Sequence, residues 1–539
     1  MTLNEFLSHW SITENPFRGE EARNDAVFVR MTGSGGLRGT GAKLVDLQTD
    51  TLAFPPPSHP LASFHSDFDK VLGDLHRPST SIVFGEKGSG KTAMRLQIAS
   101  RVAQHNAEHP AARVLMVAYD DLNPFLARVH ERVGGKTPLE SFQQLRLVDH
   151  MDAILHTVVP RLVDAILGLR AQDDPIDLGA DVKRIARRLD RYDVRDLLLL
   201  QALYDRPEQA EHRTAELRGR LGAWRSMSIV FGDAMVLVGP IVLAALFVWG
   251  KFFPPAWLTG DWPVYALAGL GAMWLLFALK HAVWDRLTLA RTCGRIKRQL
   301  RVLSRSPRSW ARSLRQLPAG CRDPEVLPIG ETDEVRYSLF SRLRRLLGAF
   351  GYTGMLVVID RVDEPTLVSG DADRMRAITW PLLNNKFLQQ EGLGVKMLLP
   401  VELRHALFRE SSSFFQEARL DKQNLIERLA WTGPMLFDLC NARLQACRSA
   451  AVGPEGAAPA ITLLDLFAED VTRQDLVDAL DQMHQPRRGQ PHPASALWQH
   501  HQPARPSRFA WVPERSARTV SPAIIRWPTS TEGSMPSGR

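Results

Sequence analysis

Cysteine is scarce in this sequence, and the 4 residues present show no metal or redox spacing. No two of them have the two-residue separation of zinc or dithiol motifs, and nothing indicates a secreted disulfide framework. A reducing, cytosolic environment is therefore expected. The cysteines are Cys293, Cys321, Cys440 and Cys447.

No cleavable signal peptide is expected either. The first residues, MTLNEFLSHWSITENPF, include Glu5 and His9 and no uninterrupted apolar run, so any membrane insertion must come from internal segments. Apolar residues make up 45% of the 539 residues, which excludes a largely disordered chain and allows two to four domains. The net charge of +8 suits nucleic acid or anionic lipid and selects neither.

Two long stretches lack charge almost entirely. Residues 226–250 contain one charged side chain, Asp233, and residues 262–279 contain none. Each approaches the roughly 20 apolar residues that cross a bilayer. Aromatic residues gather at the linker between them, and arginine and lysine are frequent on both outer flanks. The pattern predicts a transmembrane hairpin over 229–279, with spans at about 229–250 and 262–279. A buried helical hairpin of a soluble domain is the alternative.

Asp233 is the main objection to the first span. A central aspartate costs about 2.5–3.5 kcal/mol on insertion scales, but a charge near the cytoplasmic end of a span reaches water. A functional role for Asp233 inside the membrane is the less favoured interpretation.

A glycine-rich loop lies between a short β-branched run, residues 81–84, and a helical pattern. It matches the phosphate-binding pattern GxxxxGK[ST] in full. Glycines let backbone N–H groups turn toward phosphate, and the following helix N-terminus adds partial positive charge. Lys91 is expected at the β- and γ-phosphates and the Thr92 hydroxyl at Mg²⁺; an ordinary glycine-rich turn is the alternative. The loop consists of Gly85, Glu86, Lys87, Gly88, Ser89, Gly90, Lys91 and Thr92.

A second apolar run, residues 354–359, ends in an acid. Mg²⁺ beside phosphates needs a nearby carboxylate, directly or through water, and Asp360 fits that role. Asp363 and Glu364 follow, placed to polarise an attacking water. Glu364 is favoured as catalytic base and Asp363 is the alternative. Either residue could instead have a purely structural role, as the N-cap of the next helix.

Further runs complete the pattern of a parallel α/β sheet. Residues 114–118 and 394–399 are strand candidates separated from the others by helix-length gaps, and helical segments are expected from there through Cys447. The helical pattern around residues 147–166 is expected to kink or divide at Pro160.

These motifs resemble the KAP-type and STAND-like branch of P-loop NTPases, within the AAA/ORC-like ATPases. The resemblance lies in the Lys91/Thr92 loop, in the acidic strand end from Asp360 to Glu364, and in Asn15-Pro16-Phe17, which is similar to a motif of AAA-like and ORC-like ATPases. KAP-type proteins commonly carry transmembrane helices between the two motifs. The resemblance implies an ATPase in a regulatory or host-defence setting. Arg361 stands where many relatives have a carboxylate, so fast hydrolysis is not implied.

The choice of nucleotide and the remaining site residues follow from weaker signals. No guanine-reading NKxD occurs, since Asn384-Asn385-Lys386-Phe387-Leu388 has the wrong fourth residue, so ATP is favoured over GTP. By the resemblance, Glu402 and Arg404 occupy a γ-phosphate-sensing position, and a plain surface ion pair is the alternative.

The expected fold is an α/β P-loop NTPase sheet flanked by helices, interrupted by a helical region with the membrane hairpin. Two spans return the chain to the side that it left, so the strands before and after complete one sheet. The Pro/Arg-rich end cannot sustain a core, which indicates a disordered tail or an out-of-frame reading of the gene. The expected segments are an irregular N-terminal cap (1–79), the NTPase domain in two parts (80–125 and 330–450), a helical insert (126–228), the hairpin (229–279), a basic helical stalk (280–329), a C-terminal helical segment (451–484) and the tail (485–539).

The leading hypothesis is an ATPase, with ATP and Mg²⁺ as ligands, that switches the conformation or assembly of a complex at the membrane. The expected location is the inner (cytoplasmic) membrane, multi-pass, with the NTPase domain and both termini cytoplasmic. The first alternative is a nucleotide-gated scaffold with negligible hydrolysis, and Arg361 keeps it open. The second is a membrane-tethered ATPase directed to nucleic acid, which is not favoured because no recognition helix or zinc module is visible. The expected partners are ATP and the lipid bilayer; homo-oligomerisation and a protein partner stay open.

Overall fold

The computed structural model describes residues 10, 12, 14–17, 21–31, 65–169, 175–179, 181–223, 227–252, 262–447, 461–467 and 470–482. The predicted tail (485–539), most of the N-terminal cap and the hairpin linker lie outside these residues. The strands are β1 (Ser81–Gly85), β2 (Arg113–Tyr119), β3 (Tyr352–Ile359), β4 (Leu393–Pro400) and β5 (Asn424–Ile426). The helices are α2 (Ala26–Met31), α3 (Phe68–Leu72), α4 (Lys91–Glu108), α5 (Asn123–Val133), α6 (Pro138–Phe142), α7 (Leu147–Leu167), α8 (Val182–Arg188), α9 (Arg191–Tyr204), α10 (Ala210–Arg220), α11 (Met227–Phe252), α12 (Trp262–Leu279), the π-helical turn η2 (Lys280–Trp284), α13 (Asp285–Gln299), α14 (Pro307–Arg315), α15 (Glu334–Ala349), α16 (Ala372–Thr379), α17 (Asn385–Leu388), α18 (Val401–Leu407), α19 (Ser412–Ala418), α20 (Gly433–Ala446) and α21 (Arg473–Asp481), with short 3₁₀ turns η3 (Ala319–Cys321), η4 (Trp380–Leu382), η5 (Leu420–Lys422) and η6 (Leu464–Leu466).

One five-stranded, all-parallel sheet organises the α/β part, with strand order β2-β3-β4-β1-β5. β1 and β4 are buried along their whole length, as expected for apolar strands covered on both faces. In register, Phe84 pairs with Leu399 and Ile359 with Met397. Because all strands are parallel, their carboxyl ends meet at one edge, and the loop after β1 and the acid after β3 emerge there on either side of β4.

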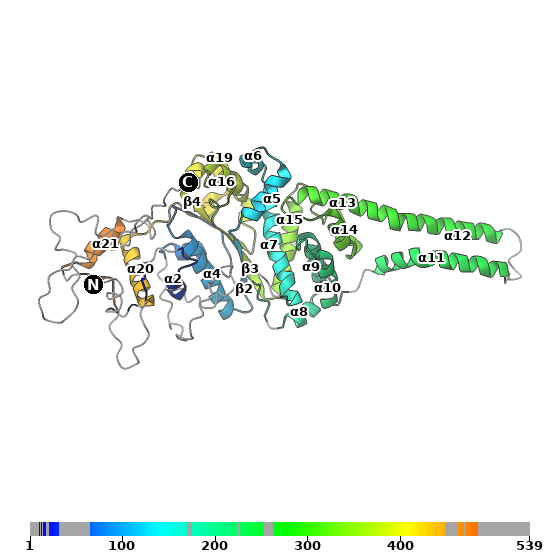
Figure 1. Cartoon of the computed structure of the whole chain (residues 1–539), viewed down its shortest axis with the longest axis horizontal. Helices are drawn as coiled ribbons and strands as arrows, with labels where there is room; N and C mark the ends of the chain where they lie inside the picture. Colours follow the sequence, from blue (N-terminus) through cyan, green and yellow to red (C-terminus); the bar gives the residue numbers. More distant parts are fainter. Residues whose placement is uncertain are drawn as a thin grey trace, which may run out of the picture.

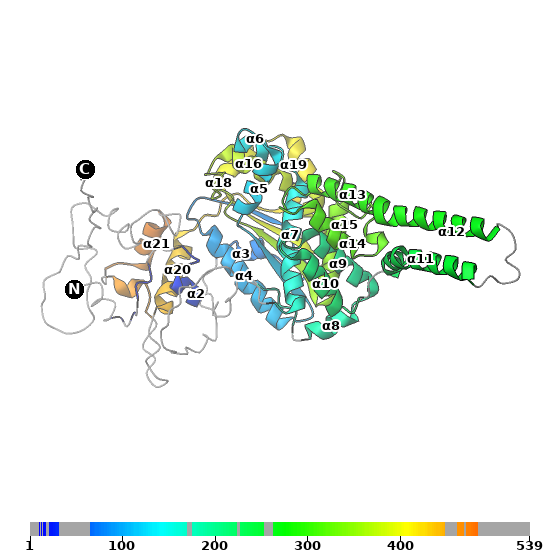
Figure 2. The ribbon, with the colours of Figure 1, turned by 45° about the vertical axis from the view of Figure 1, so that its right-hand side comes forward.

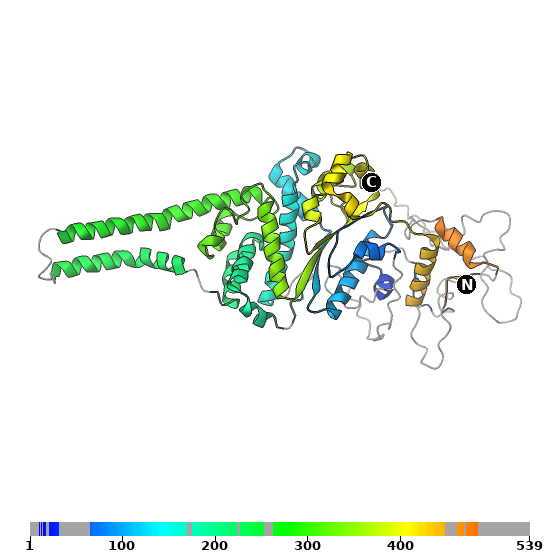
Figure 3. The ribbon, with the colours of Figure 1, turned by 180° about the vertical axis from the view of Figure 1, so that it is seen from behind.

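Helices cover both faces of the sheet. Alternate strand residues point to opposite sides, so Val83 and Leu398 pack with Ile98 of α4 in one core cluster. Phe84 packs on the other side, in the cluster that contains α7 and α15. Figure 2 shows α4 on one side of the strands and α7 on the other, and Figure 3 shows the same layers from behind.

One prediction about local structure is wrong, and another is wrong in one of its two alternatives. Residues 424–426 form β5, which extends the sheet beside β1, whereas the sequence analysis expects helices throughout that region. Three residues are too few for a periodic signal, and their pairing with β1 decides their conformation. Pro160 does not divide α7, which runs unbroken from Leu147 to Leu167, because burial along almost its whole length holds the helix together.

Two helices of the insert are long and apolar enough to cross a membrane. α11 projects from the rest of the molecule, and α12 lies beside it and continues through η2 into α13 (Figure 1). The apolar windows of the two helices are 11% and 0% buried, so large side chains such as Phe231 and Leu237 face outward. Helices of a soluble core would be buried instead.

Asp233 of α11 has two partners, Arg315 and His281. Arg315, at the end of α14, donates to Asp233 Oδ1 at 2.8 Å, and His281 Nε2 lies 3.3 Å from the same oxygen. These contacts connect α11 to the helical insert and to the π-helical turn η2.

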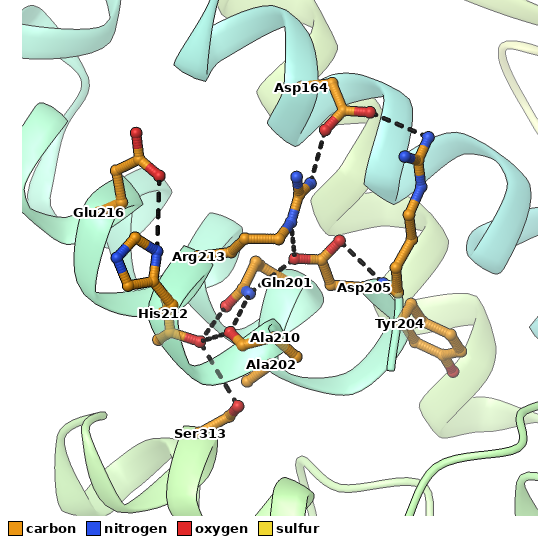
Figure 4. A network of polar contacts seen from close by, with 12 residues as sticks. Asp164, Gln201, Ala202, Tyr204, Asp205, Ala210, His212, Arg213, Glu216 and Ser313 are labelled. Carbon is orange, nitrogen blue, oxygen red and sulfur yellow. Dashed lines mark hydrogen bonds and ion pairs between the residues drawn. The ribbon is translucent and has the colours of Figure 1, made fainter. Parts of the chain in front are cut away.

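Buried polar contacts hold the insert together. Arg213 of α10 lies between two buried acids, with Nε donating to Asp205 Oδ2 at 2.9 Å and a terminal nitrogen 2.7 Å from Asp164 Oδ1 (Figure 4). Gln201 also donates to Asp205 at 2.8 Å. α7, α9 and α10 are thereby linked by charge as well as by apolar packing.

Removing the cation from this network is expected to destabilise the insert strongly. Arg213→Ala leaves the buried Asp205 without its ion-pair partner and Asp164 with Arg206 alone, which costs roughly 3 kcal/mol of unfolding free energy. Chemical denaturation of the full chain in detergent measures it, with the exposed Arg184→Ala as control. A change below about 1 kcal/mol contradicts the importance of the network.

The N-terminal segment and the C-terminal helices share a core. Val27 and Met31 of α2 pack with Leu436 of α20 and Leu476 of α21. Arg443 of α20 donates to the carbonyl of Pro16 at 2.5 Å. The predicted cap therefore contains a helix at residues 26–31, which packs against α20 and α21.

Candidate functional site

The glycine-rich loop turns tightly between β1 and α4. Gly88 and Gly90 have φ values of 89° and 96°, in the region that favours glycine. A Cβ on Gly85 would lie 2.3 Å from Ser89 Oγ, so a larger residue there would force the Ser89 hydroxyl to move. Lys91 Nζ donates to the carbonyls of Gly85 and Glu86 at 2.8 and 2.9 Å, which keeps the ammonium group over the loop.

The segment after β5, residues 428–431, contacts the outside of the glycine-rich loop, and we call these contacts the clasp. Trp431 Nε1 donates to the carbonyl of Ser89 at 2.8 Å, and Arg428 pairs with Glu86 at 2.9 Å. The backbone N–H of Leu429 donates to the carbonyl of Phe84 at 2.7 Å. Trp431 also belongs to the core shared by α2, α20 and α21, so this core touches the loop directly. No local pattern in the sequence points to these residues.

Trp431→Phe is expected to loosen the loop without unfolding the chain. It removes the indole N–H and leaves the Ser89 carbonyl without that donor, at a cost of about 1 kcal/mol. We expect nucleotide affinity to fall roughly fivefold in an equilibrium binding measurement. Trp380→Phe, which removes an indole donor away from the loop, is the control. An unchanged affinity in Trp431→Phe would show that the clasp does not hold the loop.

Asp360 meets Thr92 at the carboxyl edge of the sheet, although the two residues are 268 positions apart. Thr92 Oγ1 donates to Asp360 Oδ2 at 3.2 Å. The carboxylate is 1% exposed, and burial raises its pKa above the ordinary aspartate value. The nearby Arg95 guanidinium, with Nε 3.5 Å from Oδ2, opposes that shift. A buried carboxylate beside a hydroxyl is a donor pair that Mg²⁺ accepts.

The sequence does not predict a role for Arg95 or for its partner Asp120. Arg95 lies one turn after Thr92 on α4, and it donates to Asp120 Oδ2 at 2.7 Å. Arg23, before α2, donates to the same oxygen at 2.6 Å. A chain of alternating charges therefore runs from the N-terminal segment to Asp360. Only tertiary contact creates it, because Arg23, Asp120 and Asp360 come from distant parts of the chain.

The three residues after Asp360 form a tight turn. Arg361 has a φ of 61°, which is uncommon for a residue with a side chain, and its N–H donates to Asp360 Oδ1 at 2.9 Å. The Arg361 side chain forms an ion pair with Glu364, which is exposed. The favoured catalytic base is therefore engaged by a cation three residues before it.

Asp363 interacts electrostatically with Lys91 of the loop. Burial lowers the pKa of Lys91, and Asp363 is the strongest of the carboxylates that oppose this, ahead of Asp360, Glu402 and Glu364. Neither Asp363 nor Glu364 caps the next helix, because Asp371 accepts the N–H of Arg374 at 2.9 Å at the start of α16. The capping explanation for the two acids does not hold.

Glu402 and Arg404 lie at the start of α18, directly after β4. Arg404 pairs with Glu427 at 2.7 Å, so it does form a surface ion pair, but with a partner other than Glu402. Glu402 is exposed, and its charge is among those that raise the pKa of Lys91.

Comparison with known proteins gives no match to this chain among family models, curated proteins or solved structures. The functional argument therefore depends on the residues and their geometry.

Proposed function

We propose that the chain is a membrane-anchored P-loop ATPase of the KAP-type or STAND-like kind. The observation that carries the proposal is the contact of Thr92 Oγ1 with Asp360 Oδ2 at 3.2 Å, beside a loop of phosphate-binding sequence at the start of a long helix. Loop, hydroxyl and buried carboxylate gather at the edge where parallel α/β sheets bind ligands.

Each residue has a distinct part in this proposal. Backbone N–H groups of the loop and the N-terminus of α4 would hold phosphate, and Lys91 would neutralise it. Thr92 and Asp360 would hold Mg²⁺, which supplies charge neutralisation at the phosphates when bound. The described residues contain no cluster of three or more His, Cys, Asp or Glu ligands. One carboxylate and one hydroxyl suit Mg²⁺, which keeps several waters.

A second candidate function is a nucleotide-gated scaffold that hydrolyses ATP negligibly. The ion pair between Arg361 and Glu364 favours it, because a carboxylate paired with a guanidinium is not free to hold the attacking water. Asp363 is the other acid that could serve as base, and its charge raises the pKa of Lys91 more than the charge of Glu364 does.

Arg361→Ala separates these possibilities. If Glu364 is the base, removing its cationic partner raises turnover several-fold, because the carboxylate is free to accept a proton. Phosphate release at saturating Mg²⁺-ATP measures the effect, and Arg374→Ala, on the neighbouring helix, is the control. A variant that binds ATP and still shows no turnover supports the scaffold.

The membrane part of the proposal comes from α11 and α12. Their exposed apolar surface would be covered by lipid, and the ion pair of Asp233 with Arg315 would lie at the cytoplasmic boundary. Both outer flanks then stay in the cytoplasm, at the inner membrane, with ATP turnover switching the conformation or assembly of a membrane complex. A regulatory or host-defence role follows only from the family resemblance.

The direct test uses the full chain purified in detergent. Nucleotide binding is measured with a fluorescent ATP analogue, with and without Mg²⁺, and phosphate release is measured alongside. We expect Mg²⁺-dependent binding that ATP displaces and GTP displaces poorly. A chain that binds neither nucleotide at millimolar concentration overturns the proposal, and extraction from membranes without detergent overturns its membrane part.

A further inference from the structure

α13 continues α12 beyond the apolar stretch, and one side of it packs on the insert. Leu289, Cys293 and Ile296 are buried in the main core, so this side is turned toward the body of the molecule. Figure 1 shows α12 and α13 as one long helical path that leads from the projecting pair to α14. The remaining sides of α13 are exposed.

Six cations occupy this exposed surface. They share high exposure, and within the described part of the chain none of them forms an ion pair or a side-chain hydrogen bond. They are Lys280, Arg286, Arg291, Arg295, Lys297 and Arg298. We call this set the α13 cation row.

The row stands apart from arginines close by. Arg301 pairs with Asp149, Arg312 with Glu211 and Arg315 with Asp233. Residues 280–299 contain a single acid, Asp285, whose Oδ2 lies 3.5 Å from His281 Nδ1. These three arginines have acidic partners, whereas no acid pairs with the α13 cation row among the described residues. An uncompensated row of exposed cations produces a positive potential that attracts anions.

The position of the row on the helix favours lipid as that partner. Exposed apolar side chains extend past Lys280 to Trp284 and Leu287, which are 59% and 41% exposed. Tryptophan is frequent at the membrane–water boundary, and a lysine just inside it can extend its ammonium group to the headgroups. At 1.5 Å per residue, Arg286 lies about 3 Å along the axis from Trp284, within a headgroup layer several ångströms thick.

We propose that the membrane-proximal end of the α13 cation row, Lys280 and Arg286, binds the phosphate groups of anionic phospholipids. The inference rests on the membrane part of the proposed function. Nucleic acid is the competing anion, but it would engage the whole row, and Lys297 and Arg298 lie about 20 Å farther along the helix from Trp284. Lipid binding therefore depends on the proximal end of the row alone, whereas binding of nucleic acid depends on the distal end as well.

The test compares two variants that each remove two positive charges. The full chain, Lys280→Gln/Arg286→Gln and the distal Lys297→Gln/Arg298→Gln are reconstituted in phosphatidylcholine vesicles that contain brominated phosphatidylglycerol or brominated phosphatidylcholine. Quenching of tryptophan fluorescence gives the relative affinity for the two lipids. We expect the native chain to prefer phosphatidylglycerol and the proximal variant to lose roughly fivefold of that preference per cation. The distal variant should lose less than about twofold, because its charges lie beyond a Debye length of about 8 Å.

Each other outcome counts against the inference. Equal quenching by both lipids in the native chain overturns it and leaves the membrane anchor intact. No quenching by either lipid overturns the membrane part of the proposed function as well. Salt-dependent binding of a DNA duplex that is lost in the distal variant, without a lipid preference in the native chain, assigns the row to nucleic acid.

Discussion

Lys91→Ala is expected to reduce Mg²⁺-ATP turnover by roughly 10²–10³-fold, the effect of removing one charge-stabilising group from a phosphoryl-transfer site. The native ammonium group lies over the loop, bonded to the carbonyls of Gly85 and Glu86 at 2.8 and 2.9 Å. Its pKa is lowered by burial, and four nearby carboxylates oppose that shift, Asp363 and Asp360 foremost. The cation is therefore held where phosphate would arrive.

Lys87→Ala is the matched control for this experiment. Lys87 belongs to the same loop, but its side chain is exposed and it occupies a variable position of the pattern. Its removal should change turnover less than about threefold, within the range of a solvent-screened charge. If both lysines proved equally dispensable, the loop would be an ordinary glycine-rich turn.

Asp360→Asn is expected to weaken Mg²⁺ binding strongly, though measurably, and to lower turnover about 10²-fold or more. The amide is nearly isosteric, so the hydrogen bond with Thr92 can persist while the negative charge that attracts Mg²⁺ is lost. Asp373→Asn, on the surface of α16, is the control. Equal Mg²⁺ dependence in the native chain and in Asp360→Asn would remove Asp360 from the site.

The pH dependence of Mg²⁺ binding should follow from the same carboxylate. Burial raises the pKa of Asp360, so the proton competes with Mg²⁺ at a higher pH than at an ordinary aspartate. Mg²⁺ affinity should fall on acidification as the carboxyl group is protonated, and the fall should begin at a higher pH than at an ordinary aspartate. Titration of native chain and Asp360→Asn at several pH values measures the fall, which should be absent in the variant.

Local signals in the sequence were enough for the main parts of the fold. The four longer strands are apolar runs of the right length, and the glycine-rich loop and Asp360 lie at their ends. Because the carboxyl ends of parallel strands lie at the same edge of the sheet, the glycine-rich loop after β1 and Asp360 after β3 are expected to meet there. The long uncharged stretches likewise indicated α11 and α12 without any knowledge of their packing.

What the sequence did not reveal depends on tertiary contact. Trp431 clasps the loop from beyond β5, and Arg95 and Arg23 converge on Asp120 from separate segments. No motif assigns these residues a role, because their hydrogen bonds join segments that are distant in the sequence. The ion pair between Arg361 and Glu364 depends on the conformations of the two side chains. A spacing of three residues permits this pair but does not require it.

A double-mutant cycle on Mg²⁺ affinity tests the shared site most directly. Thr92→Ala, Asp360→Asn and the double variant are titrated with Mg²⁺ in the presence of a fluorescent ATP analogue, with the full chain in detergent. If hydroxyl and carboxylate hold one ion, the two losses are not additive, and the coupling amounts to roughly 1–3 kcal/mol. Losses that add within about 0.5 kcal/mol would mean that the two residues act independently, and the proposed nucleotide site would not exist as described.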